Sequence, residues 1–175
     1  MKKILVIILG LLLCFVLAAC NSRDDEDIEE NPDEFSYEML DLSIMVGDLY
    51  RSLDITKLTA NSVSVITDET VLTEQYYLNL DDLISYEVRC ADGKYGVADI
   101  IVLRVKEGKA EAAMEALEKR KDDRINEFLN YDVYNSYNIA VDAEIYQVGE
   151  LVVMLMLSED DKETVKELID GYIPQ

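Results

Sequence analysis

The chain has 175 residues, 16 of them basic and 37 acidic, and its formal charge at pH 7 is −21. It contains no His, which excludes Ser-His-Asp and Cys-His catalysis and the usual zinc sites. The acidic balance, with no cluster of Lys or Arg to offset it, excludes nucleic acid as an expected partner.

The first twenty residues have the pattern of a secretory signal. Lys2 and Lys3 are followed by an almost wholly apolar run over 4–17, which is short for a membrane span. An ordinary signal peptide or an uncleaved N-terminal anchor would account for this run. The stretch Leu17-Ala18-Ala19-Cys20, however, resembles the bacterial lipobox.

The lipobox resemblance implies cleavage between Ala19 and Cys20 and attachment of a diacylglycerol to the Cys20 sulfur, with acyl chains such as palmitate. Two or more such chains bind a bilayer stably. We therefore expect residues 1–19 to be removed as a signal peptide. The protein is then expected on the extracytoplasmic face of the cell membrane, anchored by its N-terminal lipid.

Residues 20–34 are expected to form an acidic tether, since eight residues after Cys20 are acidic and one is basic. The alternative is a calcium-binding tail, but the acids lack the alternating ligands and central Gly of an EF-hand loop. Residues 35–175 then form a single domain, whose only thiol is Cys90.

The domain is predicted to open with a helix. Asn31-Pro32-Asp33-Glu34 is typical of a helix start, and an apolar stripe continues from Phe35 through Met39 to Leu53. Residues 54–67 fit a short strand or a loop equally well. A short helix is predicted after Thr67, ending near Asn79.

Two strand pairs follow, each ending in a helix. Alternation over 84–90 and the apolar run 97–105 predict the first pair, and the stripe from Ala110 to Phe128 predicts a long helix. Its segment 118–124 mixes four bases with three acids, which is typical of a solvated face.

The runs 139–148 and 151–157, joined at Gly149-Glu150, predict the second pair, and Ser158 is predicted to cap a closing helix with Glu159, Asp160 and Asp161 in its first turn. The predicted fold class is therefore α+β: an N-terminal helix, then ββα-ββα, forming a four-stranded, mainly antiparallel sheet with helices on one face.

Several stretches resemble the family of lipoprotein domains called domain of unknown function 4358, from Gram-positive, clostridia-like bacteria. They are Tyr77-Leu78-Asn79-Leu80-Asp81-Asp82-Leu83, Ala116-Leu117-Glu118-Lys119-Arg120, Gly149 and the lipobox, and the likeness extends over 35–172. The resemblance implies a lipoprotein, and it implies no activity, substrate or catalytic residue.

Three acidic or thiol positions are candidates for chemistry. Cys90 is the only thiol of the domain, but no His is available to activate it, so a small core residue is the better interpretation. Asp81 and Asp82 could act as a carboxylate pair, or cap a turn. Asp99 lies within an apolar strand, where it could share a functional pocket with Arg104 or an acid of the neighbouring strand, or else face an edge or form a salt bridge.

The candidate interaction surface is a Tyr- and Asn-rich loop containing Tyr131, Tyr134, Asn135 and Tyr137. Tyr and Asn make adaptable contact surfaces, although the rings could instead cover a sheet edge. We expect a non-catalytic interaction or accessory module with no metal or other cofactor, whose partner is a membrane or cell-envelope protein. The alternatives are a lipoprotein that captures a cation, cationic peptide or glycan, and an enzyme that uses carboxylates alone.

Overall fold

The computed structural model describes residues 35–53, 63–92 and 96–173, all within the unit Phe35–Gln175. The expected signal peptide and tether therefore lie outside the described residues, as do Ala19 and Cys20. No described helix combines the length and apolar character needed to cross a membrane.

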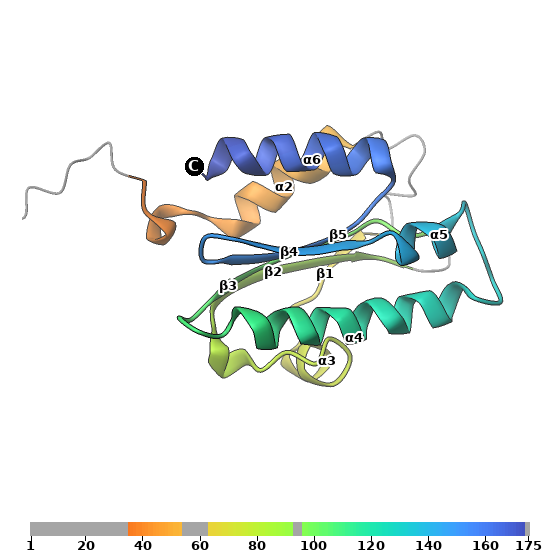
Figure 1. Cartoon of the computed structure of the whole chain (residues 1–175), viewed down its shortest axis with the longest axis horizontal. Helices are drawn as coiled ribbons and strands as arrows, with labels where there is room; N and C mark the ends of the chain where they lie inside the picture. Colours follow the sequence, from red (N-terminus) through yellow and green to blue (C-terminus); the bar gives the residue numbers. More distant parts are fainter. Residues whose placement is uncertain (1–34, 54–62, 93–95, 174–175) are drawn as a thin grey trace, which may run out of the picture. The chain divides into compact units, whose positions relative to one another are not determined.

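A five-stranded antiparallel sheet forms the centre of the domain (Figure 1). Its strands, in the order β1-β2-β3-β5-β4, are β1 (Val63–Val65), β2 (Leu83–Ala91), β3 (Asp99–Val105), β5 (Leu151–Met156) and β4 (Glu144–Val148). The α+β class and the antiparallel sheet are confirmed. The expected strand number is wrong, because the segment that fitted either a strand or a loop adds β1 to the edge of the sheet.

Helices cover both faces of the sheet, so the expectation of helices on one face is wrong. Figure 1 shows α2 (Leu42–Ser52) and α6 (Glu159–Tyr172) on one side, and α3 (Glu69–Glu74) and α4 (Ala110–Phe128) on the other. Ile100 and Val153 belong to the core cluster that packs against α2 and α6, whereas Ile101 and Met154 belong to the cluster that packs against α3 and α4. The central strands β3 and β5 are apolar on both faces, and both faces must therefore be covered.

The N-terminal helix begins later than its apolar stripe predicts. A 3-10 turn, η1 (Tyr37–Met39), comes first, and the Asp41 side chain then accepts the amides of Ser43 and Ile44 at 2.9 and 3.1 Å. The helical part of the stripe is buried, whereas Met39 is 74% exposed. Asn31-Pro32-Asp33-Glu34, predicted as the helix start, lies outside the described residues.

The segment before β4 is helical where a strand was predicted. Ile139 belongs to α5 (Ser136–Val141), and its amide donates to the Asn135 carbonyl at 3.1 Å. Ala140 is fully buried in the core cluster next to α4. The second hairpin therefore starts only at Glu144.

Two smaller helical elements complete the structure. Asp68 caps α3, the short helix predicted after Thr67, which ends at Glu74 and not near Asn79, and the 3-10 turn η3 (Leu80–Asp82) leads into β2. Ser158 caps α6, which confirms the predicted closing helix.

Candidate functional site

A pocket of about 330 Å³ lies at one end of the sheet, between α5 and the start of α6. Its apolar wall is formed by Val97, which precedes β3, by Ile139 of α5 and by Leu157, which follows β5. In Figure 1 this is the right-hand end, where α5 and the first turn of α6 lie. Because β3 and β5 are antiparallel neighbours, the residues before β3 and after β5 meet there.

Tyr134 and Asn135 form part of the pocket rim. Both have left-handed backbone conformations, with φ values of 53° and 66°. Asn135 is the N-cap residue of α5, and its side-chain oxygen accepts from the Asn138 amide nitrogen at 2.5 Å. Tyr134 is 73% exposed, so its ring remains accessible beside the pocket.

Three carboxylates line the same pocket: Asp142, Glu159 and Asp161. The Ser158 hydroxyl donates to the Asp161 carboxylate at 2.6 Å, so Asp161 takes part in capping α6. Glu159 pairs with the ammonium group of Lys162 at 2.8 Å. Two of the three carboxylates therefore already have partners within α6.

Lys162 lies next to these acids but does not line the pocket. It is 3% exposed, donates to the Asp142 carbonyl at 2.8 Å, and pairs with Glu144 at 3.4 Å as well as with Glu159. Burial disfavours its charged form, but the hydrogen bond and charge of Glu159, together with Glu144, hold the pKa of Lys162 above its usual value. The positive charge of Lys162 is therefore compensated by Glu144 and Glu159.

The four residues of the expected interaction surface do not form one surface in the structure. Tyr134 and Asn135 line the pocket, and Tyr131 is 61% exposed outside the lining. Tyr137 instead packs against the core cluster beside α4, and its backbone amide donates to the Asp132 carboxylate at 3.0 Å. Because helix α5 starts only at Ser136, the three-residue spacing of the tyrosines does not place them on one helix face.

The acidic side of the pocket was not identified from the sequence. Glu159 and Asp161 were recognised only as first-turn residues of the closing helix, and Asp142 fell within a predicted strand. Nothing in the sequence links Val97 to Leu157, because only the antiparallel pairing of β3 with β5 brings these two residues to the same end of the sheet. The acids that follow Ser158 were the only feature of the sequence that could have indicated the acidic side of the pocket.

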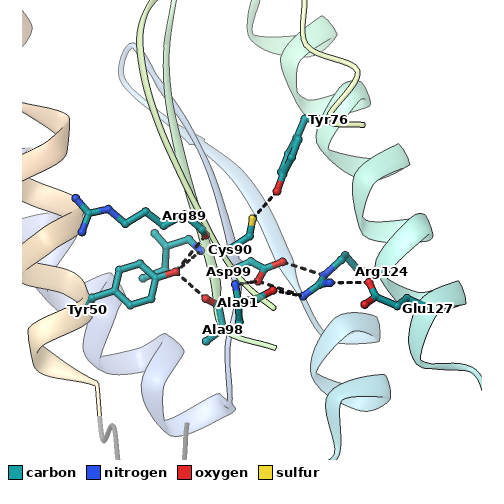
Figure 2. Close-up of polar contacts among 10 residues, drawn as sticks. Tyr50, Tyr76, Arg89, Cys90, Ala91, Ala98, Asp99, Arg124 and Glu127 are labelled. Carbon is teal, nitrogen blue, oxygen red and sulfur yellow. Dashed lines mark hydrogen bonds and ion pairs between the residues drawn. The ribbon is translucent and has the colours of Figure 1, made fainter. Parts of the chain in front are cut away.

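Cys90 is a buried core residue, as the sequence indicated. The Tyr76 hydroxyl donates to its sulfur at 2.8 Å (Figure 2). Burial raises the pKa of the Cys90 thiol well above its usual value, and the nearby charge of Asp99 raises it further. The thiol is therefore not prepared to act as a nucleophile.

Asp99 is fully buried and forms a salt bridge, which was one of the interpretations of its position. Its partner is Arg124 of α4, with Nε 3.0 Å from Oδ2 (Figure 2), whereas Arg104 pairs with Glu150 at 2.7 Å. Arg124 is 3% exposed, so this part of the charged segment 118–124 faces the sheet instead of solvent.

Asp99 and Tyr50 together stabilise the end of the β2–β3 pair at which the chain passes from β2 to β3. The Asp99 carboxylate accepts the Ala91 amide at 2.9 Å, and Arg124 donates to the Ala91 carbonyl at 3.1 Å. From the α2 side, the Tyr50 hydroxyl donates to the Ala98 carbonyl at 2.6 Å and accepts the Ile100 amide at 3.1 Å. Figure 2 shows these contacts on the two sides of the sheet, where they fix strand ends.

Asp81 and Asp82 take part in a turn, as one of the two interpretations had it. Asn79 caps η3 through the Asp81 amide, and the Asp82 carboxylate pairs with Lys109 at 2.9 Å. The hydrogen bond from Lys109 lowers the pKa of Asp82, although desolvation opposes this shift. Among the described residues there is no group of three or more acidic or thiol side chains arranged to hold a metal ion.

Comparison with known proteins gives one match. The sequence model of the family described as "Domain of unknown function (DUF4358)" matches residues 57–157. The matched range contains the sheet and α4, and it ends just before the Ser158 cap. No curated protein and no solved structure matches the chain significantly.

Proposed function

The chain belongs to the DUF4358 family, and because that description names no activity, we propose a function from the sequence and the site: a lipid-anchored, extracytoplasmic binding module. It serves as an accessory or interaction protein and performs no covalent chemistry. The pocket between α5 and α6 is its binding site. The observation that carries this proposal is the convergence of Tyr134 and Asn135 with three carboxylates around one cavity.

The anchor is supported by the N-terminal sequence. The basic start, the apolar run and the stretch Leu17-Ala18-Ala19-Cys20 suit a lipoprotein signal with Cys20 as the acylated residue. Acyl chains on Cys20 would hold the protein at the outer surface of the cell membrane. The acidic residues of 21–34 then repel one another and separate the anchor from the domain.

The place of the pocket in the fold also suits a binding module. Tyr37, near the start of the described domain, lies against Gly149 in the β4–β5 turn, and its carbonyl accepts from Arg104 at 3.0 Å. That turn lies at the left end of the sheet in Figure 1, whereas α5 and the first turn of α6 lie at the right end. The pocket and the segment that leads to the tether are therefore at opposite ends of the sheet.

The chemistry of the lining favours binding over catalysis. Asp161 and Glu159 already interact with Ser158 and Lys162, and the Ser158 hydroxyl is itself a helix cap. The chain has no His to serve as a base, and the Cys90 thiol is buried. Ser158, Glu159 and Asp161 therefore stabilise the start of α6, and the pocket suits recognition of a partner more than catalysis.

Two forms of partner fit this proposal, and the pocket favours the second. The first is a cell-envelope protein that docks on the exposed Tyr131 and Tyr134, and the second is a smaller ligand captured inside the pocket. A photo-crosslinking amino acid placed at position 134 of the full chain in intact membranes distinguishes them. A discrete protein adduct indicates the first form, and a small mass increase of the chain indicates the second.

Ile84 provides the matched control, because it is 51% exposed and lines a separate groove next to the β4–β5 turn. The crosslinker at position 84 is expected to give only background adducts. Equal adducts at both positions, or none at position 134, would contradict the proposed binding site.

A further inference from the structure

Strand β4 is an edge of the sheet, because no described strand lies beyond it in the strand order. The direction of its free backbone groups follows from the ladder. The Glu150 carbonyl accepts the Val105 amide at 3.0 Å, so the even-numbered residues of β5 bond to β3 and the odd-numbered ones bond to β4. Those odd-numbered residues are paired with the even-numbered residues of β4. The amides and carbonyls of Ile145 and Gln147 therefore point away from the sheet.

The outward backbone groups of Ile145 and Gln147 have no partner in the part of the chain that the structure describes. At the two ends of β4, side chains already bind the neighbouring carbonyls. Lys121 donates to the Ala143 carbonyl at 2.7 Å, and the Gln147 side chain donates to the Gly149 carbonyl at 2.8 Å. The open part of the edge is therefore the backbone of Ile145 and Gln147, which suits a short strand.

This edge lacks the features by which proteins usually protect an exposed edge strand, namely Pro, Lys and bulges. β4 has the sequence EIYQV, without Pro or Lys, and it pairs with β5 in one uninterrupted register. Glu144 is its only charged residue, and its carboxylate pairs with Lys162 and Lys166 of α6. The edge of β4 is thus open to strand addition, in which an extended peptide bonds to exposed backbone groups.

The helices on either side of β4 select the charge of the added strand. Figure 1 shows β4 between α6 above it and α4 below it. Lys121 of α4 contacts the Ala143 carbonyl and Lys166 of α6 contacts Glu144, so the faces of both helices around these lysines lie next to β4.

Three exposed acids lie three or four positions from these lysines, and therefore on the same helix faces: Glu118 on α4, and Glu163 and Asp170 on α6. Burial raises the pKa of Tyr146 in β4, and the charge of Asp170 raises it further, which agrees with this placement. None of the three acids forms an ion pair with another described residue. A basic strand at this edge would meet complementary charge.

We propose that β4 binds an extended basic segment of another protein, which adds a sixth strand to the sheet and places Lys or Arg side chains beside Glu118, Glu163 and Asp170. Its backbone bonds to Ile145 and Gln147, and its alternate side chains reach the α4 and α6 sides. A second copy of this acidic chain, or its acidic residues in 21–34, would bring like charge to the same edge. No residue of β4 lines the α5–α6 pocket, so the proposal does not rest on that site.

Fluorescence anisotropy tests the proposal with a labelled hexapeptide of alternating Lys and Val, titrated with the full chain in micelles of a neutral detergent. Replacing every Lys of the peptide by Glu is expected to weaken binding about tenfold or more. N-methylation of two successive central residues keeps the charge but blocks backbone bonding on both edges of the peptide. We expect this change also to weaken binding about tenfold.

Gln147→Pro removes an outward amide that has no partner in the described domain, and proline is tolerated at such edge positions. It should weaken binding of the lysine peptide about tenfold. Gln147→Ala is the matched control, since it keeps the amide and should bind like the wild type. Thermal unfolding of both variants shows whether the proline variant is folded.

A second pair of variants tests the charge without changing the edge. Glu118→Gln combined with Asp170→Asn should weaken binding of the lysine peptide about fivefold. The matched control is Glu69→Gln combined with Glu74→Gln, which removes the same charge from exposed positions of α3 and should leave binding unchanged.

Hydrogen exchange measured by mass spectrometry locates the bound peptide. The lysine peptide should slow exchange in 144–148 and leave 63–65 and 133–142 unchanged. Protection at β1 or at the pocket instead, equal binding of the lysine and glutamate peptides, full binding of the N-methylated peptide, or no binding at all would overturn the proposal. A dimer in sedimentation that dissociates in Gln147→Pro would show that a second copy of the chain occupies this edge.

Discussion

Asp99 and Arg124 place opposite charges in a part of the domain from which water is excluded. Asp99 is fully buried and Arg124 is 3% exposed, with 3.0 Å between Oδ2 and Nε. Arg124 also pairs with Glu127 at 2.6 Å, and Asp99 accepts the Ala91 amide. Removing one member of such a pair leaves the other charge without compensation, which destabilises a protein far more than losing a surface pair.

We therefore expect Arg124→Met to lower the free energy of unfolding by about 3–5 kcal/mol. Adding Asp99→Asn should restore part of this loss, since a neutral amide removes the unpaired charge and can still accept the Ala91 amide. Urea unfolding of the two variants measures the effect. Lys119→Met on the exposed side of α4 is the control, with an expected change within about 0.5 kcal/mol. Equal stability of Arg124→Met and Lys119→Met would show that the buried pair contributes nothing.

For individual residues, the sequence predicted which side chains are unusual or buried better than it predicted the residues that they contact. Cys90 was interpreted as a core residue because alternation placed it on the apolar face of its strand, and the structure confirms this. Asp99 was recognised as unusual for a strand, but Arg124 was assigned to a solvated face. The Asp99–Arg124 contact joins a strand to a helix 25 positions further on, and only the packing of α4 on the sheet brings the two together.

At the scale of elements, the β4–β5 turn depends on Gly149. Its φ is +55°, and a Cβ atom built there would overlap the Tyr37 hydroxyl. Tyr37 in turn packs edge-to-face on Phe35, with ring centroids 5.0 Å apart. A side chain at position 149 would therefore displace the segment that leads into the first helix.

Gly149→Ala is expected to be more destabilising than Gly108→Ala. Gly108 also has a positive φ, +74°, but nothing lies within 4 Å of an added Cβ. Gly108→Ala therefore measures only the backbone strain, about 1–2 kcal/mol. The additional loss at Gly149 should be about 1 kcal/mol, the scale of one aromatic contact. It should disappear in the background Tyr37→Ala. Thermal unfolding of the four variants checks this, and equal losses at the two glycines would refute the Tyr37 contact.

The edge strand β4 is joined to α6 by Glu144, which pairs with Lys162 and Lys166. The hydrogen bond from Lys166 lowers the pKa of Glu144, although desolvation opposes this shift. A lowered carboxyl pKa stabilises the folded state above the unfolded pKa, and this contribution is lost as the pH falls through the folded pKa.

Glu144→Gln should consequently reduce stability at pH 7, by no more than about 1 kcal/mol because the site is partly exposed. Its stability should approach that of the wild type below about pH 4. Urea midpoints measured from pH 7 to pH 3 test this, with exposed Glu163→Gln as the control. A difference that stays constant over this range would mean that the ion pairs are not its cause.

Most elements were predictable because their ends are encoded locally. Ser158 was predicted as a cap and a short helix was predicted after Thr67, and the side chains of Ser158 and Asp68 both accept helix amides in the structure. The start of α2 was misplaced because an apolar stripe does not show that Asp41 caps a separate helix. The strand predicted from residue 139 was wrong at its start, because β-rich composition there is overridden by packing of α5 against the core.

For the whole molecule, topology decides where function can lie. The order β1-β2-β3-β5-β4 places the residues before β3 beside those after β5, and thereby forms the pocket. Local patterns do not encode that order, which is why the sequence indicated Tyr134 and Asn135 but none of the pocket acids as binding residues. The continuous apolar runs of β3 and β5 do encode burial on both faces, and they were the available signal for a second helical layer.

The proposed binding module depends on its expected lipid anchor at Cys20 to stay at the membrane. We expect the full chain, expressed in a bacterial host that processes lipoproteins, to incorporate an alkyne analogue of palmitate. Cys20→Ser should abolish this incorporation, because the acylated sulfur is removed. Cys14→Ser is the matched control, since Cys14 lies in the apolar run and should leave labelling unchanged. Labelling that persists in Cys20→Ser, or is lost in Cys14→Ser, would mean that the protein is held at the membrane in another way and that the lipid anchor must be abandoned.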